Sequence, residues 1–75
     1  MNVVTIKGFG RNAKCHSPES LQVMLVERYI NKPVAIIQTL KSGLNKTFFV
    51  TVRGDGRLVK TYNETEEVPL STFTF

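Results

Sequence analysis

Cysteine is nearly absent from this chain of 75 residues, because Cys15 is the only one. A single thiol forms no disulfide within the chain, which excludes a disulfide-stapled secreted scaffold and fits a reducing compartment. Histidine is equally rare, with His16 alone, and tryptophan is missing. One Cys and one His supply two soft ligands where a zinc site needs three or four. The composition therefore predicts no metal site.

Long apolar runs are also missing. The longest have four residues, at 23–26 and 34–37, whereas a membrane-spanning helix needs roughly 20. The first seven residues lack the charged-then-apolar order of a secretion signal. These absences predict a cytoplasmic protein without a membrane segment.

Candidate catalytic groups are few. Cys15 and His16 are adjacent, but neighbouring residues rarely present their side chains to each other, and catalytic pairs normally come from distant positions. The two Gly-x-Gly segments, 8–10 and 54–56, lack the third glycine or the Lys-Ser/Thr of nucleotide-binding loops. We therefore predict a protein with no catalytic residues and no cofactor.

Charge is unevenly distributed along the chain. Residues 1–62 contain all ten Lys and Arg and three acids, a net charge of +7, whereas residues 63–75 contain three acids and no base. A basic body favours an anionic partner, and the acidic segment is able to screen that surface within the molecule. We accordingly divide the chain into a compact basic domain over 1–62 and an acidic-then-apolar C-terminal tail over 63–75.

A helix is predicted over about 18–30. Ser17 suits the N-cap, Pro18 suits the first helical position, and Glu19 complements the positive end of the helix dipole. Because 21–29 is rich in β-branched residues, a strand there is the alternative. Before this helix, Val3 to Phe9 reads as a strand and residues 8–12 read as a loop.

The segment 33–44 fits two structures. As a helix, it places Ile36, Ile37 and Leu40 on one face, with Gly43 as a left-handed C-cap. As a strand, it places the side chains of Val34 and Ile36 on one face and those of the intervening residues on the other. The sequence leaves both open.

An antiparallel hairpin is predicted over 47–62, where an Asp-Gly turn signal separates two β-rich runs. A two-residue turn places Phe49 opposite Tyr62. A register one residue away is disfavoured because it puts Arg53 opposite Arg57, two like charges. In the preferred register one face carries Phe48, Val50, Val52 and Val59, and the other carries Phe49, Thr51, Arg53, Leu58, Lys60 and Tyr62.

Together these elements predict one small α+β domain. It has an antiparallel sheet, the C-terminal hairpin 47–62 and one or two helices. If both ambiguous segments are extended, the alternative is a small β-barrel.

Aromatic side chains between basic ones on a sheet are typical of single-strand nucleic-acid binders, because bases stack on rings while cations contact phosphates. The polar face of the hairpin has this composition. We therefore predict a non-enzymatic binding or regulatory protein that contacts nucleic acid through a basic, aromatic-bearing sheet face. The predicted nucleic-acid-binding residues are Phe49, Tyr62, Lys41, Lys46, Arg53, Arg57 and Lys60.

Two helices at 18–30 and 33–42 followed by the hairpin would instead resemble the order of a helix-turn-helix with a β-wing. The second helix then offers few side chains for reading duplex DNA, namely Gln38, Thr39, Lys41 and Ser42.

A protein-binding inhibitor or adaptor is the alternative function. It would act through a sheet edge and the C-terminal tail, which adds to a neighbour's sheet or docks in its groove. Exchange of such tails between two copies would give a homodimer. The predicted partner-binding residues are Leu70, Phe73 and Phe75. The competing interpretation is that the rings of Phe73 and Phe75 fill the domain's own core.

Overall fold

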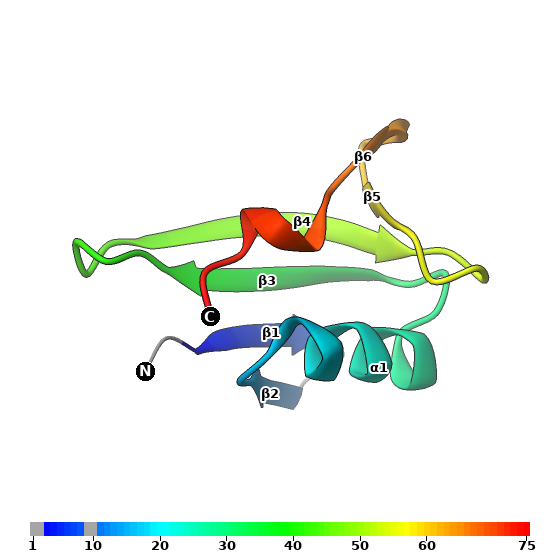
Figure 1. The fold of residues 1–75 in the computed structure, drawn as a ribbon. Helices are drawn as coiled ribbons and strands as arrows, with labels where there is room; N and C mark the ends of the chain where they lie inside the picture. Colours follow the sequence, from blue (N-terminus) through cyan, green and yellow to red (C-terminus); the bar gives the residue numbers. More distant parts are fainter. Residues whose placement is uncertain (1–2, 9–10) are drawn as a thin grey trace.

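The computed structural model describes residues 3–8 and 11–75. Six strands form one open antiparallel sheet in the order β2-β1-β3-β4-β5-β6. The helix α1 and the short 3-10 turn η1 both lie on one face of this sheet (Figure 1). The predicted small α+β domain is confirmed, and the sheet does not close into the alternative barrel. The elements are β1 (Val4–Gly8), β2 (Arg11–Cys15), α1 (Pro18–Arg28), β3 (Pro33–Thr39), β4 (Asn45–Val52), β5 (Leu58–Lys60), β6 (Asn63–Glu67) and η1 (Leu70–Thr72).

The helix α1 begins where the capping signal predicts. Ser17 has extended backbone, with φ −150° and ψ 158°, and its hydroxyl accepts a hydrogen bond of 3.1 Å from the Ser20 amide. Leu21 and Leu25 are fully buried against the sheet. The helix prediction is therefore confirmed, with its end at Arg28, and the alternative strand over 21–29 is wrong.

Replacing Ser17 with alanine should lower the free energy of unfolding by about 1 kcal/mol, because the Ser20 amide loses its partner. Urea denaturation followed by circular dichroism measures the change. Ser42→Ala is the matched control, since Ser42 lies exposed in the β3–β4 turn. Equal stability of the two variants would contradict the capping role.

The ambiguous segment 33–44 contains strand β3, which lies between β1 and β4. Val34 and Ile36 alternate into the core, and Gly43, with φ +88°, lies in the turn to β4. The second helix and the helix-turn-helix are therefore wrong. A central strand buries its apolar residues against two neighbours, which favours the extended form of this segment.

The hairpin prediction is confirmed, but its register is wrong by one residue. Val52 lies opposite Leu58, and the Arg53 amide donates to the Arg57 carbonyl at 2.8 Å, which leaves a three-residue loop. Gly56, with φ +89°, supplies the left-handed residue that such a loop needs. The two arginines tolerate facing each other because each guanidinium has its own carboxylate partner.

Two strands lie where the sequence predicted a loop or tail. Arg11–Cys15 form β2 beside β1, whereas Phe9 and Gly10 of the predicted 8–12 loop lie outside the described residues. Asn63–Glu67 form β6, which pairs with β5 at the far edge of the sheet. The first part of the acidic tail is therefore a strand.

The rest of the tail returns across the core. Val68 and Phe73 are buried, and the Phe73 ring meets Phe48 edge-on at 5.5 Å between centroids. The Gln38 amide nitrogen, buried within the sheet, donates to the Thr72 carbonyl and to the Thr74 hydroxyl, both at 2.8 Å. Residues 68–75 thus cover the part of the core that α1 leaves open.

Candidate nucleic-acid interface

One face of the sheet carries no other element of the described chain (Figure 1). Directly opposed residues share a face, so its cross-strand rows follow from the registers. One row, Pro33–Thr51–Val59–Glu67, continues this face to β6. The two rows of interest lie nearer β2. The first row runs Lys7–Ala35–Phe49 across β1, β3 and β4, and the second runs Lys14–Thr5–Ile37–Thr47 across β2, β1, β3 and β4. We call these seven residues the open face.

Phe49 is the most prominent side chain of the open face, with 60% of its surface exposed. Its cross-strand neighbour is Ala35, whose methyl group leaves the side of the ring uncovered, and Lys7 follows on the next strand. Strands lie about 4.8 Å apart, so the backbone of Lys7 lies about 10 Å from that of Phe49. A base stacked on the ring therefore has its phosphate within reach of this lysine.

Positive charge on the open face is not offset locally. Strands β1 to β4 contain no Asp or Glu. Lys7 and Lys14 are exposed, and neither takes part in an ion pair among residues 3–8 and 11–75. The open face therefore combines an accessible ring, two cations and the hydroxyls of two threonines.

Tyr62 is not on this face. It is 76% exposed in the turn between β5 and β6. The Lys60 ammonium lies 5.8 Å from the Tyr62 ring and 5.9 Å from the Phe48 ring. Lys60 opposes Val50 and so lies on the helix side of the sheet. The predicted pairing of Phe49 with Tyr62 is wrong, because the one-residue change of register turns them to opposite faces.

Three of the predicted cations bind the chain's own acids. Arg53 pairs with Glu64, and Lys60 lies 3.6 Å from Glu66. The interaction with Tyr62, followed by that with Glu66, raises the pKa of Lys60. These contacts come from β6, so the acidic segment screens the basic hairpin within the molecule.

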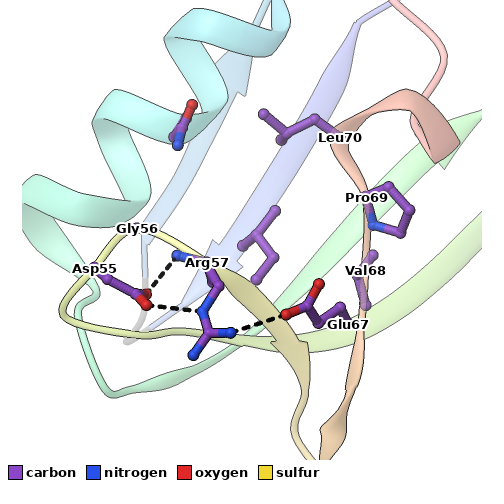
Figure 2. A pocket seen from close by; sticks show the side chains of 9 residues that line it. Asp55, Gly56, Arg57, Glu67, Val68, Pro69 and Leu70 are labelled. Atoms are coloured by element: carbon purple, nitrogen blue, oxygen red, sulfur yellow. Dashed lines mark hydrogen bonds and ion pairs between the residues drawn. The ribbon is translucent and has the colours of Figure 1, made fainter.

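Arg57 is the most fully engaged of the three. Figure 2 shows it between Asp55 and Glu67, beside a pocket. Its guanidinium lies 2.7 Å from the Asp55 carboxylate and 3.0 Å from that of Glu67, and the pocket has a volume of about 300 Å³. The Arg57 amide also donates to Asp55, and this hydrogen bond is the main reason that the pKa of Asp55 is lowered. The pKa of Arg57 is raised in turn, chiefly by its hydrogen bond to Asp55. Arg57 is thus a partner of carboxylates at the end of the hairpin.

The remaining predicted cations lie near the β3–β4 turn. Lys41 is exposed within that turn. The Lys46 ammonium lies 4.8 Å from the Phe48 ring, on the helix side of β4. Of the seven residues predicted to bind nucleic acid, the open face therefore contains Phe49 alone.

The predicted partner-binding residues form part of the domain's own core. Phe73 is 6% exposed, and Leu70 and Phe75 are partly buried against the same cluster. They do not form a free C-terminal tail.

Cys15 and His16 do not form a nucleophile–base pair. Cys15 is fully buried in β2, and burial raises the pKa of its thiol, which holds it in the unreactive protonated form. His16 is exposed.

Ellman's reagent should therefore label Cys15 slowly in the folded protein and rapidly in denaturant, because labelling requires opening of the edge strand. The absorbance of the released thiolate measures the rate. Equal rates in buffer and in denaturant would contradict the burial.

Sequence reasoning missed Lys7 and Lys14. Their signal was present as alternation: Lys7 follows Val4 and Ile6 on the opposite parity, and Lys14 separates Ala13 from Cys15. The second signal was not recognised because residues 8–12 read as a loop.

Comparison of the chain with protein-family models, curated proteins and solved structures found no match. No helix in the described part of the chain is long and apolar enough to cross a membrane. The fold and the open face are therefore the basis for the functional interpretation.

Proposed function

We propose that this protein binds single-stranded nucleic acid across the open face of its sheet. The observation that carries the proposal is Phe49, an exposed ring on β4, in the part of the sheet (β1 to β4) that contains no Asp or Glu. Lys7 and Lys14 lie on the same face, on β1 and β2. An exposed aromatic side chain on a central strand offers a base a flat apolar surface, and every base has a face that stacks.

Phe49 acts as the stacking platform, and small Ala35 leaves room for the base beside it. Lys7 and Lys14 contact phosphates on the side of β1 and β2. The Thr5 and Thr47 hydroxyls are available to bond sugar or base edges. Since the lysines contact only the backbone, the expected binding has little sequence preference and falls as salt rises.

The test is a fluorescence-anisotropy titration of labelled oligothymidylate at two salt concentrations, with Phe49→Ala and the matched control Tyr62→Ala. Loss of one stacked base corresponds to about 1–3 kcal/mol. We therefore expect Phe49→Ala to weaken binding by roughly 5- to 150-fold.

Tyr62→Ala should bind as tightly as the unaltered protein, because Tyr62 is more exposed than Phe49 but lies on the other side of the sheet. Absence of binding by the unaltered protein, or equal weakening by both variants, would contradict the proposal.

A further inference from the structure

A shallow groove lies between the outer side of α1 and the β4–β5 turn. Its volume is about 560 Å³. Val23, 54% exposed, and the half-buried Val26 supply its apolar surface. Gly56 lies on the opposite side of the groove and approaches α1 closely, since a Cβ built at Gly56 would lie 3.8 Å from a Val26 methyl group.

The groove is acidic although the protein is basic overall. Glu19 and Glu27 flank Val23 along α1, four residues before and after it, so the three lie on one side of the helix. Asp55 stands on the turn and is already bonded to Arg57. Glu19 and Glu27 form no ion pair within the described residues. The groove thus has an apolar floor and two free carboxylates.

The β3–β4 turn has the complementary composition. Leu44 is 68% exposed there, and Lys41 and Lys46 lie on either side of it in sequence. No acid occurs in residues 28–54. Neither lysine joins an ion pair in the part of the chain that the structure describes. We call residues 41–46 the tip.

The tip and the groove cannot meet within one molecule. They lie at the two ends of β4, whose eight residues extend over about 26 Å at about 3.3 Å each. Figure 1 shows the β3–β4 turn at one end of the sheet and the β4–β5 turn at the other. The longest dimension of the molecule is 32 Å. Contact between these two surfaces therefore requires a second copy.

We propose that the tip of one copy docks in the groove of another copy of this chain. Leu44 covers Val23 and Val26, and the lysines of the tip face Glu19 and Glu27. The two surfaces differ, so the contact joins unlike patches. It buries little area, so association is weak, depends on protein concentration and weakens with salt. The contact involves α1 and the tip and goes beyond the open face.

Sedimentation velocity over a range of protein concentrations, without nucleic acid, tests the proposal on three samples. Leu44→Asp removes the tip contact and keeps the groove, whereas Val23→Lys removes the groove contact, because its cation repels the tip lysines, and keeps the tip. Both side chains are exposed, so both variants should fold, and circular dichroism checks this. Each variant alone should be monomeric at concentrations where the unaltered protein associates.

The decisive sample is an equal mixture of the two variants. One intact tip and one intact groove remain, so the mixture should form a heterodimer that neither variant forms alone. A monomeric unaltered protein, association of either variant as strong as before, or a mixture that stays monomeric would overturn the proposal. None of these results bears on the nucleic-acid titration.

Discussion

Replacing Phe73 with alanine should remove most of the stability of this domain. Phe73 is 6% exposed and packs edge-on against Phe48, with ring planes at 84°. Truncating a buried phenylalanine costs about 3–5 kcal/mol. At about 0.05–0.15 kcal/mol per residue, a chain of 75 residues has a total of about 4–11 kcal/mol. The variant should therefore be partly or wholly unfolded at room temperature.

Urea denaturation monitored by circular dichroism measures this loss. Phe49→Ala is the matched control, because its ring is largely in solvent and its removal should change the free energy of unfolding by less than about 1 kcal/mol. Similar midpoints for the two variants would contradict the account, and would mean that residues 68–75 are not part of the core.

Reversing two charges on the open face should have the largest effect on nucleic-acid binding. Lys7→Glu combined with Lys14→Glu replaces two phosphate contacts with two repulsions. Each contact to a single strand contributes about 0.7 to the slope of log affinity against log salt, so the slope should fall by about 1.4. At low salt the affinity should fall by at least about tenfold.

A charge-matched control separates this local effect from the change in net charge. Lys41→Glu combined with Lys46→Glu removes the same charge from the β3–β4 turn and the helix side of β4. It should lower the affinity far less, because these lysines lie off the open face. Equal losses in the two double variants would show that overall charge, and no particular face, governs the binding.

Local signals predicted the elements that carry them. The capping residue Ser17 and the following proline located α1, and the Asp-Gly turn located the β4–β5 hairpin. Periodicity could not distinguish a helix from a strand over 33–44, because Ile36 and Ile37 suit both a helix face and a buried strand. Its position between β1 and β4 decided the structure, and this depends on residues distant in sequence.

Strands that lack an apolar pattern could not be predicted from the sequence. All five residues of β6 are exposed, so this strand exists through its pairing with β5 and through its ion pairs. Those same ion pairs explain the wrong register. Repulsion between Arg53 and Arg57 is the reason that the sequence predicts the other register, yet Glu64 and Glu67 offset this repulsion from positions about ten residues away.

The sequence predicted an exposed ring on a basic sheet, but it did not predict most of the residues around that ring. Phe49 is that ring. The two lysines of the open face could not be identified, because they come from β1 and β2, which lie about 35 to 42 residues earlier in the chain. A single-residue change of register then moved Lys60 and Tyr62 to the helix side.

The most direct test of the open face is a titration of ¹⁵N-labelled protein with oligothymidylate, followed by amide chemical shifts. The account predicts that the largest shifts fall on the two cross-strand rows that contain Lys7 and Phe49, with α1 and residues 68–75 nearly unchanged. Shifts concentrated on α1 or on the β5–β6 turn, with Phe49 unaffected, would contradict it.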